Sequence, residues 1–182
     1  MFLSNDKIEK NSLRQGDIVT KIHLLGAINI NGIHYSSPAG KPRELASWNV
    51  PSVPKIGDAM VLSHSCEVAL ENNIKVTSII LAPLRDIHKA TAKDRIDELI
   101  QSNLIDRSNP SATFLKYFYI PPHPDLGYTE GAIVDFSKLF SVRNNCYKTL
   151  LDKKIAQLSE EVSSSMALKL ALYFHRQGSF TV

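Results

Sequence analysis

The chain has 182 residues, of which 43% are hydrophobic, which suits one domain with a substantial core. No apolar run approaches the roughly 18 residues of a membrane-spanning helix, and the first residues lack the basic start and apolar stretch of a signal peptide. The excess of 21 basic over 18 acidic residues is too small to indicate nucleic-acid binding over the whole surface. We therefore expect a single cytoplasmic domain over residues 1–182, with any polyanion-binding surface confined to one part of it.

The first predicted strand covers 17–25, where β-branched residues follow Gly16. A tight hairpin turn is then expected at Asn31-Gly32. The segment 36–55 contains four prolines and Trp48, so it predicts a long proline-rich loop. Loops of this length often carry function.

Two apolar runs, 59–62 and 76–82, are typical of buried central strands. A helical insertion is predicted over 91–105, because apolar residues recur there at helical spacing. Further strands are expected at 113–120 and 131–136, where β-branched and aromatic residues return.

The final predicted element is a helix that begins after Ser159 and ends at Gly178. Glu160 and Glu161 suit its N-terminal dipole, and apolar residues repeat at helical spacing at Val162, Met166, Leu170 and Tyr173. Together these elements predict a mixed α+β fold, mainly β: a small antiparallel β-barrel with a helical insertion and a C-terminal helix.

A nucleophile, a base and a carboxylate fall close together at His64, Cys66 and Glu67. In a turn the three side chains could converge, and a thiolate beside an imidazolium has the lowered pKa that nucleophilic catalysis requires. The alternative is that Cys66 is a small buried residue and Glu67 is solvated. No HExxH or paired Cys/His spacing accompanies the group, so we expect no metal and no cofactor. The other cysteine, Cys146, is far away in the sequence and predicts no disulfide.

The strongest local basic excess lies between Lys138 and Lys154. The segment has five basic residues against Asp152 alone, and Phe140 and Tyr147 lie among the charges, an arrangement that single-stranded nucleic acid binding uses. A solvated loop with inward-facing aromatics is the alternative. Arg85, after a predicted strand, could contact a phosphate or pair with Asp86. The candidate nucleic-acid-binding residues are Lys138, Arg143, Tyr147, Lys148, Lys153 and Lys154.

The order of these segments resembles the MazF/PemK family, which has the SH3-like barrel it shares with CcdB. The resemblance rests on short apolar motifs and covers most of the chain except 36–55 and the helical insertion. The motifs are Gly16-Asp17-Ile18-Val19, Ala59-Met60-Val61-Leu62-Ser63, Ile79-Ile80-Leu81-Ala82-Pro83-Leu84, residues 131–142 and residues 154–159.

The resemblance implies a bacterial, toxin-like endoribonuclease that acts on single-stranded RNA, forms a homodimer and has an antitoxin-like protein partner. The family's catalytic arginine position holds Gly57 here, and its hydroxyl position holds Arg85 or Asp86. If the chain cleaves RNA, we expect His64 to act as general base for a ribose 2′-hydroxyl and Arg85 to stabilise the charge on phosphorus, with Cys66 and Glu67 nearby.

Three functions follow as expectations. The first is binding, with or without cleavage, of single-stranded RNA. The second is a catalytically inactive protein–protein interaction module that uses the barrel rim and the loop 36–55. The third is a cysteine-dependent enzyme built on Cys66.

Overall fold

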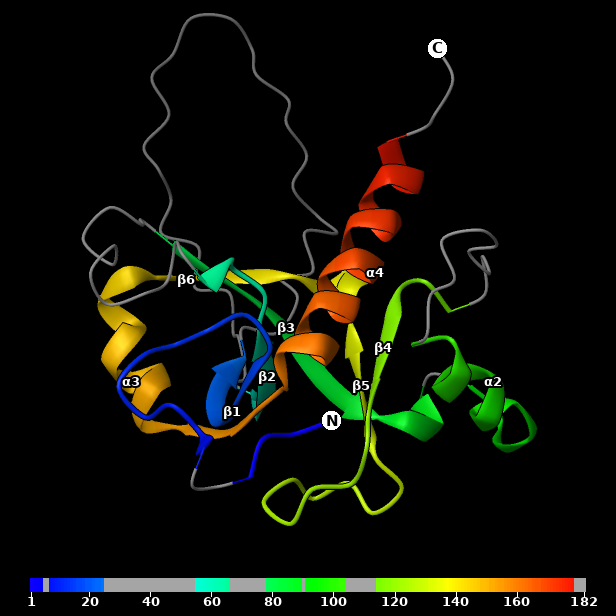
Figure 1. Cartoon of the computed structure of the whole chain (residues 1–182), viewed down its shortest axis with the longest axis horizontal. Helices are drawn as coiled ribbons and strands as arrows, with labels where there is room; N and C mark the ends of the chain where they lie inside the picture. The colour runs from blue at the N-terminus through cyan, green and yellow to red at the C-terminus, as the bar shows by residue number, and fades with distance from the viewer. Residues whose placement is uncertain (5–6, 25–54, 66–77, 90, 104–113, 179–182) are drawn as a thin grey trace, which may run out of the picture.

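Seven β-strands form one antiparallel sheet in the computed structural model, which describes residues 1–4, 7–24, 55–65, 78–89, 91–103 and 114–178 (Figure 1). Their order is β4-β5-β3-β2-β1-β7, and β6 also pairs with β3. The strands are β1 (Asp17–Leu24), β2 (Lys55–Val61), β3 (Ser78–Asp86), β4 (Tyr117–Ile120), β5 (Ala132–Asp135), β6 (Phe140–Arg143) and β7 (Lys154–Gln157).

Strand β3 joins the two halves of this sheet. One edge of β3 pairs with β2, where Ala82 lies opposite Met60. The other edge pairs first with β6 and then with β5, which are separated along the chain by a 3-10 turn at Phe136–Lys138. The result is a curled antiparallel half-barrel, and the predicted mixed α+β fold with a C-terminal helix is confirmed.

The runs 59–61 of β2 and 81–82 of β3 are buried on both faces, and this explains why these runs are apolar without interruption. Side chains alternate between the two faces of a strand. Met60 and Ala82 therefore belong to a core cluster with Met166, whereas Val61 and Leu81 belong to a second cluster with Tyr147 and Leu150. A strand covered on both faces needs no polar residue at every second position.

In the described ranges three helices pack on the sheet: α2 (Ile96–Gln101), α3 (Tyr147–Asp152) and α4 (Glu160–Gly178). Helix α4 packs Val162, Met166 and Leu170 on the first cluster, and α3 packs on the second. Figure 1 shows α4 crossing the sheet, with α3 at one end of the molecule and α2 at the other. None of the helices in the described ranges is both long and apolar enough to cross a membrane.

The predicted strands and helices are present with changed bounds, and β6, α3 and β7 were not predicted. Strand β3 continues through Pro83 to Asp86, four residues beyond the predicted end. Helix α2 is shorter than predicted and follows a 3-10 turn at Lys93–Arg95, whose N-cap makes no side-chain hydrogen bond. The predicted hairpin at Asn31-Gly32 and nearly all of the loop 36–55 lie outside the described residues.

Gly131 shows where the fold requires glycine. It precedes β5 with φ +98°, and a Cβ there would lie 2.6 Å from the carbonyl oxygen of Ile120. A side chain would therefore meet both backbone strain and a steric clash. The turn between β4 and β5 depends on this residue.

Candidate nucleic-acid interface

The basic segment 138–154 folds as β6, a 3-10 turn at Asn144–Cys146, α3 and the start of β7. Lys138, Arg143 and Lys148 have exposed side chains. Lys153 is half-buried, and its Nζ donates to the carbonyl oxygen of Lys21 at 2.6 Å. These four cations remain on the surface, where an anion could reach them.

An open hollow of about 700 Å³ lies against α3. Its wall contains two exposed lysines, Lys10 and Lys148, and a floor is provided by Tyr147 and Leu151. Three asparagines complete the lining: Asn11, Asn144 and Asn145. Among the described residues that line the hollow, none is acidic. The hollow thus combines positive charge, amide hydrogen-bonding groups and an apolar floor.

Tyr147 joins α3 to the N-terminal segment that forms one side of this hollow. Its side chain is only 4% exposed, and its hydroxyl accepts a hydrogen bond of 2.9 Å from the backbone N–H of Leu13. Because Lys10 and Asn11 come just before Leu13, this bond fixes the segment that carries them against α3. Tyr147 therefore supports the hollow as a floor residue and does not stand in solvent as a stacking platform.

Lys154 lies inside the protein. Its side chain is 2% exposed and its Nζ lies 2.7 Å from Oδ2 of Asp17, which is fully buried. The same ammonium group donates to the carbonyl oxygens of Glu9 and Ser12 and to Oε1 of Gln157. Burial raises the pKa of Asp17 to about 6, against the opposing effect of Lys154. Lys154 thus joins β7 to β1 and to the N-terminal segment, and it does not face a ligand.

His64 and Arg85 are not brought together. Ser63, beside His64, accepts a hydrogen bond from the N–H of Ile80 near the start of β3, whereas Arg85 lies near the end of the same strand. Ile80 and Arg85 are five positions apart along β3, which is roughly 16 Å at about 3.3 Å per residue. The expectation that they share one rim is not met. Cys66 and Glu67 lie outside the described residues.

Arg85 is engaged in an ion pair with a buried carboxylate. Its Nη1 lies 2.7 Å from Oδ2 of Asp135, and Asp135 also accepts hydrogen bonds from the N–H and hydroxyl of Ser137. Burial alone would raise the pKa of Asp135, but the bonds from Ser137 and Arg85 outweigh it and lower that pKa. The predicted pairing of Arg85 with Asp86 is therefore replaced by a pairing across β3 and β5.

Lys10 and Asn11 could not be predicted from sequence pattern, because they lie more than a hundred residues away from α3 in the chain. Asn144 and Asn145 could have been predicted, since they lie inside the basic segment and their amides are the usual partners of base edges. Comparison with models of protein families and with curated proteins found no match to this sequence. The resemblance to the MazF/PemK family therefore stays a prediction.

Proposed function

We propose that the protein binds single-stranded RNA at the hollow against α3. The observation that carries this proposal is the lining itself, in which Lys10 and Lys148 lie with three asparagines and, among the described residues, no acidic side chain. Two ammonium groups suit consecutive phosphates, and carboxamides can donate to and accept from the edges of unstacked bases. Arg143, exposed at the end of β6, extends the positive surface next to Asn144.

The size of the hollow is consistent with one or two nucleotides. Sites for small molecules commonly measure about 300–1,000 Å³, and this hollow of about 700 Å³ is open to solvent. An open site suits a strand that enters and leaves it. The apolar floor of Tyr147 and Leu151 would contact a sugar or a base.

The proposal concerns binding. Cleavage by His64 and Arg85 acting on one phosphate would need the two side chains within a few ångströms, and the register of β2 and β3 separates them. We therefore expect labelled RNA to remain intact during binding measurements, as judged on a denaturing gel.

The test is fluorescence anisotropy with a short, fluorescein-labelled single-stranded RNA over a range of salt concentrations. Each phosphate contact contributes about 0.7 to the slope of log K against log salt for a single strand. The double variant Lys10→Ala/Lys148→Ala should weaken binding and lower the slope by about 1.4. The matched control is Lys93→Ala, which removes an exposed lysine beside α2.

Two results would contradict the proposal. One is the absence of salt-dependent RNA binding by the wild-type protein. The other is an equal loss of affinity in the Lys93→Ala control, which would indicate that net charge and not the hollow determines binding.

A further inference from the structure

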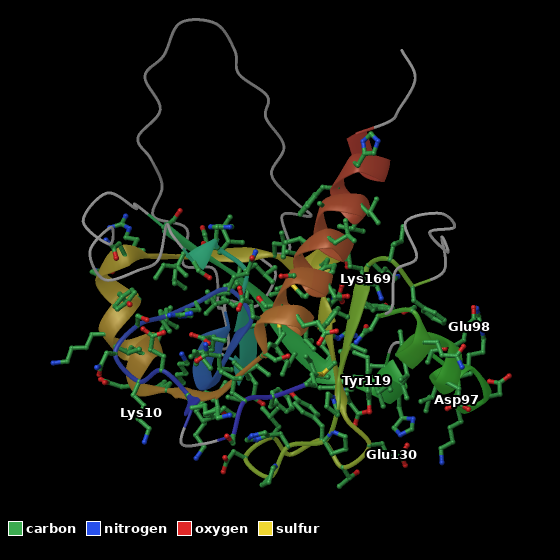
Figure 2. All side chains as sticks on the ribbon, viewed as in Figure 1. Lys10, Asp97, Glu98, Tyr119, Glu130 and Lys169 are labelled. Atoms are coloured by element: carbon green, nitrogen blue, oxygen red, sulfur yellow. The ribbon has the colours of Figure 1, made fainter. Side chains whose placement is uncertain are left out.

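Lys169 is the one lysine on α4, and its side chain is completely buried. Its Nζ lies 2.8 Å from the Oγ of Ser102, the residue that follows α2. Among the described residues, no carboxylate forms an ion pair with it. Figure 2 labels Lys169 on α4, where the helix passes the strand β4. A buried amine without an anionic partner is unusual, because burying an unpaired charge is costly.

The environment of Lys169 favours its uncharged form. Burial lowers the pKa of Lys169 to about 7. On α2, Glu98 is paired with Arg95 at the surface, and β4 contributes Tyr119, whose own pKa is raised by burial. In the described ranges, no charged group opposes this effect of burial on the pKa of Lys169. Near neutral pH a large part of the amine is therefore free to accept a proton.

Ser102 links this amine to the end of α2. Its side chain is half-buried, and its hydroxyl lies 2.6 Å from the carbonyl oxygen of Leu99 as well as 2.8 Å from Nζ. A hydroxyl can rotate, so its proton can point to either neighbour. A reagent that reaches this hydroxyl would thus meet an oxygen with a base beside it.

The next residue holds Ser102 in this position. Asn103 donates from Nδ2 to the carbonyl oxygen of Tyr119 at 2.7 Å and accepts from its N–H at 2.9 Å. The Oγ of Ser165, on α4, donates to the carbonyl oxygen of Asn103 at 2.9 Å. The end of α2 is thereby fixed to both β4 and α4, which supplies the rigid support that a catalytic pair needs.

We propose that Ser102 and Lys169 form a serine–lysine pair that hydrolyses reactive carboxylic esters, with Ser102 as nucleophile and Lys169 as general base. Serine nucleophiles activated by a neutral lysine are a known variant of the serine triad. The pair is separate from the hollow against α3, so its test is independent of RNA binding.

The reaction is balanced with water as co-reactant. The oxygen of Ser102 bonds to the ester carbonyl carbon while its proton moves to Nζ of Lys169, and the carbonyl electron pair moves to oxygen. When this electron pair re-forms the carbonyl double bond, the bond between the carbonyl carbon and the alcohol oxygen breaks. The departing alkoxide takes the proton from Nζ. Water then attacks the acyl-serine by the same route, which releases the carboxylic acid and restores both side chains.

A purely structural role is the alternative, since a lysine near a helix C-terminus also stabilises the last carbonyl groups. The test treats the full chain with a fluorophosphonate probe and locates the modified residue by peptide mass spectrometry. We expect modification of Ser102, at a rate that rises with pH through about 7 as Lys169 loses its proton. Hydrolysis of p-nitrophenyl acetate should follow the same pH profile.

The variants Ser102→Ala and Lys169→Met should reduce both rates by about 100-fold or more, the usual contribution of a general base. The controls Ser164→Ala, on the exposed side of α4, and Lys93→Met, at an exposed lysine before α2, should leave them unchanged. An unmodified Ser102 in the folded wild-type protein overturns the proposal without any variant. An unchanged rate in Lys169→Met overturns it as well.

Discussion

The two ends of the molecule each bury a lysine, and they do so in opposite ways. At the β1–β7 end, Lys154 meets the buried carboxylate of Asp17 at 2.7 Å. At the α2–α4 end, Lys169 meets only the hydroxyl of Ser102 among the described residues. The first lysine has a carboxylate buried with it, whereas the second tends to lose its proton because desolvation is unopposed.

Burial alone therefore does not determine whether a lysine has a structural role or acts as a base. Lys154 joins several chain segments, since its ammonium group reaches Asp17, Glu9, Ser12 and Gln157. Removal of one member of such a group leaves the others buried without a partner. Lys169 stabilises little and instead places a base beside a hydroxyl. The free energies of unfolding of variants at Lys154 and Lys169 should therefore change in opposite directions.

The largest expected effect is that of Lys154→Met, which should lower the free energy of unfolding at pH 7 by about 3–5 kcal/mol. The carboxylate of Asp17 would remain buried without its cation. The loss should shrink as pH falls towards about 6, because Asp17 without Lys154 binds a proton at a higher pH than it does in the wild-type protein. Urea unfolding at several pH values measures this loss in the free energy of unfolding, with Lys153→Met as the control. Equal losses in both variants would refute the buried ion pair.

Lys169→Met should act in the opposite direction and stabilise the protein by about 1–4 kcal/mol at pH 7. The folded-state pKa of Lys169 lies below its unfolded value, so wild-type stability rises with pH from about 7 towards about 10.4. Methionine does not titrate, so the gain should decline over this range. Thermal unfolding at several pH values measures it, with Lys148→Met as the control, and a constant gain would contradict the assignment.

Asn103→Ala should destabilise the α2–α4 end by about 1–3 kcal/mol, because it leaves the backbone N–H and carbonyl of Tyr119 without their partner. Esterase activity should fall with it if Ser102 is held in place by this residue. Urea unfolding and ester hydrolysis are the measurements. Asn145→Ala, an exposed asparagine at the other end, should change neither.

The smallest expected effect is that of Tyr147→Phe, about 1 kcal/mol, since it leaves one buried N–H, that of Leu13, without an acceptor. The segment with Lys10 and Asn11 would be less firmly held, so RNA affinity should fall a few-fold. Anisotropy checks this, with Tyr119→Phe as the control. Unchanged RNA affinity would show that Lys10 does not need this support.

Most of the fold could be predicted from the sequence, because β1, β2, β3 and α4 are long and strongly patterned. The region 138–154 could be predicted only as basic, since β6, α3 and β7 are four to six residues long. Charge count alone could not show that Lys154 turns inward while Lys148 turns outward. A signal for Lys169 was present: it lies three residues after Met166 and seven after Val162, on the apolar face of α4.

The sequence by itself determined the strand pattern, the closing helix and the position of the basic segment, because these depend on periodicity and local composition. Only the tertiary structure decided which basic side chains face solvent and which are buried. The tertiary structure also decided that Lys154 contacts Asp17 and that Lys169 contacts Ser102. The physical reason is that the charge of a buried lysine depends on desolvation and on partners from distant parts of the chain.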